Sequence, residues 1–224
     1  MFCRNLLGFQ LRSLRRYALT EKTHFQLFPK SFPAGGPPKD AFQVNPRLLR
    51  REYRALQSQN HPDVVMGSSA FTENTASTTA NDSASLAINN AYTMLKNPYT
   101  RAAYIIQLQH PDHIDITQDE VSKEFIAKVQ ASSEQSLNYK ELLMTVLEAH
   151  EALELATLEA DLEHLEQENS AKMLESEQKL EELLQESPVP WEQFIIETIR
   201  LKYWVNIANG IKEWEAGKPV LLTH

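Results

Sequence analysis

Cysteine, glycine and long apolar runs are scarce in this chain of 224 residues. The single cysteine, Cys3, excludes a disulfide framework within the chain and any zinc or iron–sulfur site built from several cysteines. The six glycines form no phosphate-binding loop. No stretch approaches the roughly 18 uninterrupted apolar residues that a membrane span needs. We therefore expect neither a cysteine-based metal site nor a membrane partner.

Basic residues are also fewer than acidic ones, with 22 Lys and Arg against 30 Asp and Glu, so that the formal net charge is −8. Proteins that bind nucleic acid through phosphate contacts rely on lysine and arginine, so we expect no nucleic-acid partner. The histidines are scattered, they form no Ser-His-Asp arrangement, and His110 and His113 have no third metal ligand beside them. The sequence therefore predicts a protein that is not an enzyme and that holds no metal ion or cofactor.

Residues 1–20 differ in composition from the rest of the chain. They contain four arginines, no lysine and no acidic residue, with phenylalanines and leucines between the arginines. This composition is typical of a mitochondrial presequence, and it lacks the continuous apolar core of a secretory signal. We predict a presequence over residues 1–20; the alternative is a disordered, mildly basic tail.

A basic amphipathic helix is predicted to begin at Asn45-Pro46, because asparagine is a good N-cap and proline suits the first helical position. Leu48, Leu49, Tyr53 and Leu56 recur at helical spacing and are expected to face the core. The opposite side carries four arginines: Arg47, Arg50, Arg51 and Arg54. Such a face can be merely solvated, but in an acidic protein a local positive patch is suited to steering an acidic partner towards it.

The tripeptide His61-Pro62-Asp63 follows this helix. Proline disfavours helical geometry in the residue before it, so the tripeptide is expected to end the helix and to present His61 and Asp63 on a rigid turn. Residues 66–83 are rich in Ser, Thr, Ala and Asn and are predicted to form a loop. A second copy, His110-Pro111-Asp112, has no arginine face before it, and we interpret it as a helix stop.

Two further helices are predicted between the loop and the second copy. The first is expected to place five residues inward: Leu86, Ala87, Ala91, Tyr92 and Leu95. Asn97-Pro98 ends it, and a shorter helix follows over residues 99–108.

The remainder of the chain predicts acidic helices, since residues 119–186 hold 18 Asp and Glu against 5 Lys. A short helix is expected around Phe125 to Val129, a well-formed one over residues 142–153, a long one ended by Ser187-Pro188, and a last one from Trp191 to Trp214. The last helix is apolar on two sides and needs partners on more than one side. We expect an intramolecular three-helix bundle; a sustained heptad repeat would instead indicate a coiled-coil dimer, but the apolar pattern drifts.

The order of a basic helix, His61-Pro62-Asp63 and a helix that ends before Asn97-Pro98-Tyr99-Thr100-Arg101 resembles the J-domain of Hsp70 co-chaperones. Three stretches resemble the specialised HscB type, which serves iron–sulfur cluster biogenesis: residues 97–104, 143–151 and 201–204. The resemblance covers nearly all of residues 23–217. The chain departs from it where Val64-Val65 replaces a basic residue after the tripeptide, where the cysteine-pair zinc module of some members is missing, and at residues 123–138, which look like an insertion.

This resemblance implies an all-α fold, with a J-domain helical hairpin followed by a C-terminal three-helix bundle. The expected organisation is a presequence (1–20), a J-domain (21–109), a linker (110–118), a scaffold-binding domain (119–217) and a tail (218–224). It further implies two partners in the mitochondrial matrix, a mitochondrial Hsp70 and the iron–sulfur cluster scaffold protein. The arginine face would dock the chaperone, and His61-Pro62-Asp63 would stimulate its ATPase.

The resemblance also assigns a scaffold-binding face in the C-terminal bundle: Leu143, Met144, Leu147 and Tyr203 as apolar contacts, with Glu148 and Glu151 as polar contacts beside them. The alternative is that some of these residues belong to the bundle core, because a Leu/Met stripe at helical spacing is usually core. For the whole chain, the alternatives are a general J-protein that delivers unfolded clients to Hsp70 and a structural coiled-coil adaptor.

Overall fold

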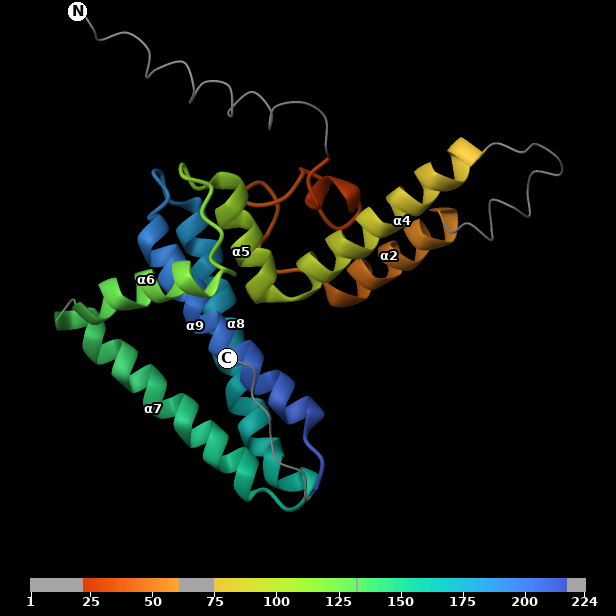
Figure 1. The fold of residues 1–224 in the computed structure, drawn as a ribbon. Helices are drawn as coiled ribbons and strands as arrows, with labels where there is room; N and C mark the ends of the chain where they lie inside the picture. Colours follow the sequence, from red (N-terminus) through yellow and green to blue (C-terminus); the bar gives the residue numbers. More distant parts are fainter. Residues whose placement is uncertain (1–21, 61–74, 132, 217–224) are drawn as a thin grey trace, which may run out of the picture.

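The computed structural model describes residues 22–60, 75–131 and 133–216. This part of the chain contains α-helices, two short 3-10 helices and no strand, which confirms the all-α prediction (Figure 1). The 3-10 helices are η1 (Phe25–Leu27) and η2 (Glu159–Leu162). The α-helices are α2 (Pro46–Asn60), α4 (Thr75–Lys96), α5 (Pro98–Gln109), α6 (Asp119–Ala131), α7 (Ser133–Leu155), α8 (Glu163–Gln185) and α9 (Trp191–Glu213).

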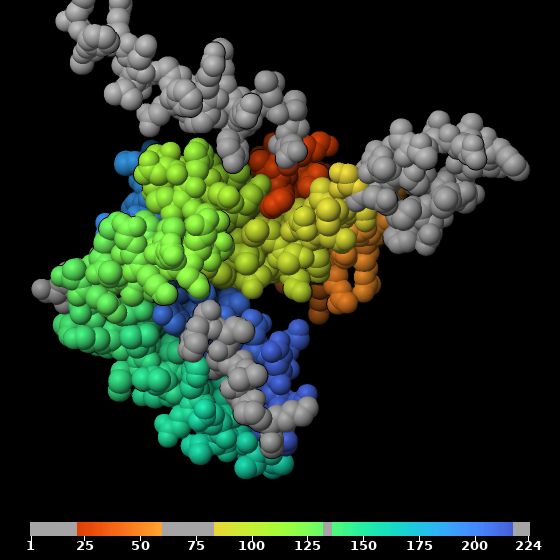
Figure 2. Space-filling view, in the orientation of Figure 1, coloured from red at the N-terminus to blue at the C-terminus, as the bar shows by residue number. Residues whose placement is uncertain are grey.

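Helices α2 and α4 form the predicted hairpin, which projects to one side of the other helices (Figures 1 and 2). The cap of α2 is as predicted, since the side-chain oxygen of Asn45 accepts hydrogen bonds from the backbone N–H groups of Arg47 at 3.0 Å and Leu48 at 3.2 Å. The rings of Tyr53 and Tyr92 stack across the hairpin with centroids 4.1 Å apart. This stacking, together with the hydrogen bond of 2.7 Å that the Tyr53 hydroxyl donates to Oδ1 of Asn89, fixes the register of the two helices.

Three expectations about this hairpin are wrong. The predicted loop over residues 66–83 is too long, because α4 already begins at Thr75; residues 66–74 lie outside the described part. Leu48 is 39% exposed, so it flanks the core instead of filling it. Leu86 is 60% exposed and Ala87 is also exposed, whereas Ile88 is buried in their place. Ala91, Leu95 and Leu49 are buried as expected.

The segment before α2 packs tightly against the hairpin. Glu52 of α2 is 4% exposed, and its carboxylate accepts hydrogen bonds from the backbone N–H groups of Lys30 and Ser31, each at 2.8 Å. Gly36 has φ +107°, and a Cβ there would lie 2.5 Å from Cγ of Phe25. Only glycine therefore fits at this turn, which lets the backbone cover the buried Phe25 ring.

Helix α5 begins where it was predicted, because the side chain of Asn97 accepts hydrogen bonds from the backbone N–H groups of Tyr99 and Thr100. It packs on α4 and on α9, and its Ile105 and Ile106 are fully buried. The core cluster that contains them extends from Phe25 to Val205. One continuous core therefore runs through the hairpin, α5, α8 and α9, across the predicted linker, whose Ile116 is also buried in it.

The C-terminal helices are organised around α9, which contacts α5, α6, α7 and α8. Helices α8 and α9 lie side by side (Figure 1), and α7 packs directly on α9, with α6 in contact with both α7 and α9. The expectation that the last helix has partners on more than one side is confirmed. The short helix expected around Phe125 is in fact the longer α6, and α7 begins only two residues after it, so the predicted insertion is largely helical.

Candidate functional site

Two groups of predicted functional residues lie in different parts of the fold. The first is the arginine face of α2: Arg47, Arg50, Arg51 and Arg54 are all exposed. His61-Pro62-Asp63 lies immediately after Asn60, the last residue of α2, and outside the described residues. The arginine side chains are therefore accessible at the surface, and their role in binding a partner stays a prediction.

The second copy of the tripeptide has a structural explanation. Helix α5 ends at Gln109, and the backbone N–H of His110 donates a hydrogen bond to the carbonyl of Ile106 as a C-cap. The His110 ring meets Trp191 edge to face, with centroids 5.5 Å apart. The backbone N–H of Asp112 donates to Nδ1 of His110 at 3.1 Å. The prediction of a helix stop is confirmed, and the stop also contacts the start of α9.

The second group of predicted residues lies around a groove between α6, α7 and α9, with a volume of about 380 Å³. Three of these residues, Leu143, Leu147 and Tyr203, line it together. Ile126 of α6 and Ile207 of α9 add apolar surface, and Lys202 lies on the same wall as Tyr203. We call this hollow the α7–α9 groove.

The exposed fractions of the α7 side chains show which of them face the groove and which belong to the core. Met144 is 60% and Leu147 is 64% exposed, so neither is a core residue. The core positions of α7 include Leu142, Val146 and Ala149, which pack against Trp204 and Ile207. Leu143 and Tyr203 are half-buried at the edge between the two sets. The core alternative is therefore wrong for Met144 and Leu147.

The two glutamates assigned to this face are both exposed but point differently. With about 3.6 residues per turn, Glu151 lies next to Leu147 and Met144 on the outward side of α7. Glu148 lies further around the helix and lines a neighbouring hollow between α7 and α8, beside Ala149 and Lys172. The structure thus brings Leu143, Leu147 and Tyr203 together, places Met144 and Glu151 beside them, and leaves Glu148 on the flank.

Sequence reasoning missed the residue that orients Tyr203. The hydroxyl oxygens of Tyr139 in α7 and Tyr203 in α9 lie 3.0 Å apart in a hydrogen bond. Burial, together with this hydrogen bond, raises the pKa of Tyr139 above its usual value, so its hydroxyl stays protonated at neutral pH. Ile126 was also missed as a site residue, although it falls in the apolar stretch that predicted the short helix. Nothing in the sequence indicates the contact between Tyr139 and Tyr203, because it joins two separate helices.

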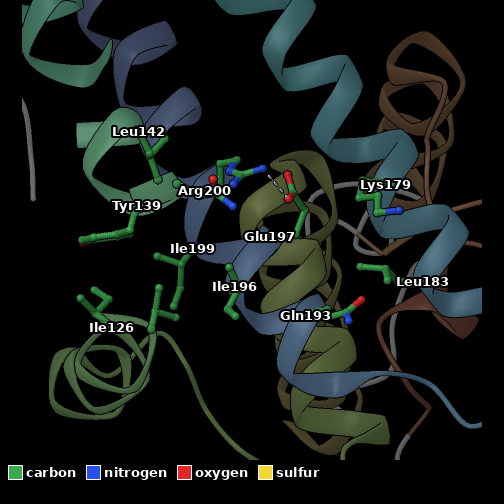
Figure 3. A pocket seen from close by; sticks show the side chains of 12 residues that line it. Ile126, Tyr139, Leu142, Lys179, Leu183, Gln193, Ile196, Glu197, Ile199 and Arg200 are labelled. Carbon is green, nitrogen blue, oxygen red and sulfur yellow. Dashed lines mark hydrogen bonds and ion pairs between the residues drawn. The ribbon is translucent and has the colours of Figure 1, made fainter. Parts of the chain in front are cut away.

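A cavity of about 350 Å³ adjoins the groove and shares Ile126 and Ile199 with it. Figure 3 shows Ile126, Tyr139 and Leu142 on one side of the cavity, and Lys179 and Leu183 of α8 on the other. Glu197 and Arg200 form an ion pair of 3.1 Å at its wall (Figure 3). Helices α6 and α7 therefore do not close tightly against α8 near the groove.

The described residues contain neither a cluster of metal ligands nor a membrane-spanning helix. No three His, Cys, Asp or Glu side chains within residues 22–60, 75–131 and 133–216 come together as metal ligands. None of the helices in the same ranges is long and apolar enough to cross a membrane.

Comparison with known proteins identifies the family. The family model described as the HSCB C-terminal oligomerisation domain matches residues 138–212, which include the α7–α9 groove. The mitochondrial J-type co-chaperone Jac1 of Saccharomyces cerevisiae is 31% identical over 202 residues, which cover 90% of this chain and 94% of Jac1. A solved Jac1 structure from the same yeast aligns with TM-score 0.57 and 32% identity, over 89% of this chain and 98% of that one.

A solved structure of the chaperone HscB from Vibrio cholerae has the same fold, with TM-score 0.55 at 24% identity, over 85% of this chain and 95% of that one. The family assignment itself follows from the yeast protein, because nearly the whole of Jac1 is matched at 31% identity. The chain therefore belongs to the HscB/Jac1 family of J-type co-chaperones.

Proposed function

We propose that this protein is the co-chaperone that delivers the iron–sulfur cluster scaffold protein to a mitochondrial Hsp70 in the matrix. The α7–α9 groove binds the folded scaffold, and the arginine face of α2 docks the chaperone. His61-Pro62-Asp63 then stimulates ATP hydrolysis in the chaperone, which locks it onto the scaffold for cluster transfer. The chain itself carries out no chemical step.

The observation that carries the proposal is an exposed apolar groove, the α7–α9 groove, in the C-terminal bundle of a protein of the HscB/Jac1 family. Leu147 is 64% exposed beside Leu143 and the half-buried Tyr203, and together they offer an apolar surface with one fixed aromatic ring. A few aliphatic and aromatic anchors of this kind usually dominate the binding energy of a protein interface. These anchors line one groove of about 380 Å³, which suits the binding of a single complementary patch on a folded partner.

The location rests on two supports. Jac1 of Saccharomyces cerevisiae is named a mitochondrial protein, and the arginine-rich residues 1–20 have the composition of a presequence. The partner Hsp70 and the scaffold would then be those of the mitochondrial matrix.

The experiment that tests this function compares two ligands of the purified protein. We expect calorimetric titration to detect binding of the folded scaffold and none of a reduced, denatured polypeptide of similar length. Binding of the denatured polypeptide alone would contradict the proposal and favour a general J-protein that delivers unfolded clients.

A further inference from the structure

A second large hollow opens at the surface where the α2–α4 hairpin meets α8 and α9, with a volume of about 710 Å³. Its apolar surface comes from Leu49, the stacked rings of Tyr53 and Tyr92, and Met173 of α8. The long helices of the C-terminal part thus form one wall, and the hairpin forms the other. We call this hollow the basic cleft.

Most of the charged side chains that line this cleft are cations. Arg50 and Arg54 come from α2, Lys96 is the last residue of α4, and Lys212 lies in the last turn of α9. Among the described residues these four side chains form no ion pair. The single acidic residue of the lining, Glu177, is already paired with the buried Arg101 at 3.3 Å. In a chain of net charge −8, these side chains form a local excess of positive charge.

The cleft is continuous with the arginine face of α2. Arg50 and Arg54 are one helical turn apart and line the cleft, whereas Arg47 and Arg51 of the same face do not. The positive surface therefore turns from α2 into the cleft and ends at Lys212, in the part of the chain that was expected to bind only the scaffold.

We infer that the chaperone-docking surface extends from α2 across the basic cleft to Lys96 and Lys212, and that an acidic segment of the Hsp70 partner binds there. This inference rests on the proposed function. The cations are distributed over three helices around an apolar floor, so a compact phosphate would reach only some of them. A polypeptide segment with several carboxylates and an apolar side chain would meet both the cations and the floor.

This arrangement gives α9 contacts with both partners. Lys212 and Tyr203 lie about two and a half turns apart, and therefore on opposite sides of the helix. Tyr203 faces the α7–α9 groove and Lys212 faces the basic cleft. A charge change at Lys212 thus leaves the scaffold-binding face untouched.

The test uses Lys96→Glu and Lys212→Glu, singly and together, with Lys123→Glu in α6 as the matched control. All three lysines are exposed, and Lys123 lies outside the cleft. In an ATPase assay, the double variant is expected to need roughly tenfold more protein for half-maximal stimulation of the chaperone, with a slower association rate. The difference shrinks as salt is added, because screening weakens attraction between exposed charges. Lys123→Glu is expected to match the wild type.

Both lysines also lie in the last turns of their helices, where a positive charge stabilises the helix. Lys96→Gln and Lys212→Gln separate the two roles, since a purely structural effect would lower the melting temperature without changing the salt dependence of association. Unchanged half-maximal stimulation in the double variant would overturn the inference. Binding of inorganic phosphate is measured for the same proteins. If the double variant stimulates the chaperone normally but no longer binds phosphate, the cleft is a small-anion site and the inference is wrong. Asp63→Ala, measured in parallel, tests the proposed function separately.

Discussion

Leu142 and Leu147 lie on the same helix, yet their side chains have opposite surroundings. Leu142 is 8% exposed and packs in the bundle core, whereas Leu147 is 64% exposed at the α7–α9 groove. We predict that Leu143→Ala with Leu147→Ala weakens scaffold binding by about 2 kcal/mol with little change in the melting temperature. Calorimetric titration and thermal unfolding measure the two effects.

Leu142→Ala serves as the control for that pair. Truncating a buried leucine costs about 2–3 kcal/mol of unfolding free energy, so this variant is expected to lose stability while its folded fraction still binds the scaffold. If the double groove variant unfolds as readily as Leu142→Ala, the groove residues are structural and the assignment is wrong.

Tyr139 allows a prediction about stability at high pH. Its pKa is raised above the ordinary value of 10.0, first by burial and then by the hydrogen bond with Tyr203. Burial also raises the pKa of Tyr99, to about 12. A raised pKa in the folded state means that the neutral hydroxyl is favoured there, so its stabilising contribution is complete below pH 10 and is lost as the pH rises further.

The variant Tyr139→Phe has no hydroxyl at this position, so it lacks the contribution of Tyr139 to the loss of stability at high pH. It is expected to cost about 1 kcal/mol at neutral pH, because one hydrogen bond disappears, and to show a smaller decline of stability above pH 10 than the wild type. Urea unfolding over a pH series measures both. An identical alkaline decline in the two proteins would show that the Tyr139 hydroxyl does not titrate as inferred.

Between elements, one buried ion pair joins the J-domain part to α8. Arg101 of α5 is 3% exposed, and its guanidinium contacts Glu177 at 3.3 Å and donates to the carbonyl of Leu95. Burial lowers the pKa of Arg101 to about 10 and raises the pKa of Glu177 above its usual value. Both shifts favour the neutral forms, so the desolvation of the two charges outweighs their mutual attraction.

We therefore predict opposite outcomes for breaking this pair and for replacing it. Glu177→Leu leaves Arg101 buried without its partner and is expected to cost about 3 kcal/mol of unfolding free energy. Arg101→Met combined with Glu177→Leu is expected to recover most of that loss. Chemical denaturation of the wild type, Glu177→Leu and the double variant measures the three unfolding free energies. A double variant as unstable as Glu177→Leu alone would contradict the prediction.

The boundaries of α2 and α5 were predictable because they depend on local chemistry, an asparagine cap followed by proline at residues 45–46 and 97–98. The extent of α6 and α7 was not, since the sequence predicted only short helices around residues 125–129 and over 142–153, whereas α6 spans Asp119–Ala131 and α7 spans Ser133–Leu155. The rotation of α4 was also misjudged, because its partner decides that Ile88, and not Leu86, faces the core. At the candidate site, Leu143, Leu147 and Tyr203 were assigned through the family resemblance, whereas the contact of Tyr203 with Tyr139 depends on packing between helices.

For the molecule as a whole, α9 is the element that both halves share. Its residues belong both to the core of the hairpin and to the smaller core beneath the groove. Because one core runs across the predicted linker, we expect a single cooperative transition in calorimetric unfolding of the full chain. Two resolved transitions would contradict this expectation and favour independently folding domains.

The central claim is that one chain brings a chaperone and its folded cargo together. The most direct measurement is the ATP hydrolysis rate of the chaperone, with and without scaffold, for the wild type, Asp63→Ala and Leu143→Ala with Leu147→Ala. The account predicts that the wild type stimulates hydrolysis further when scaffold is added and that Asp63→Ala gives no stimulation. The groove variant should stimulate without any gain from the scaffold. Equal stimulation by all three proteins, whether or not scaffold is present, would contradict it.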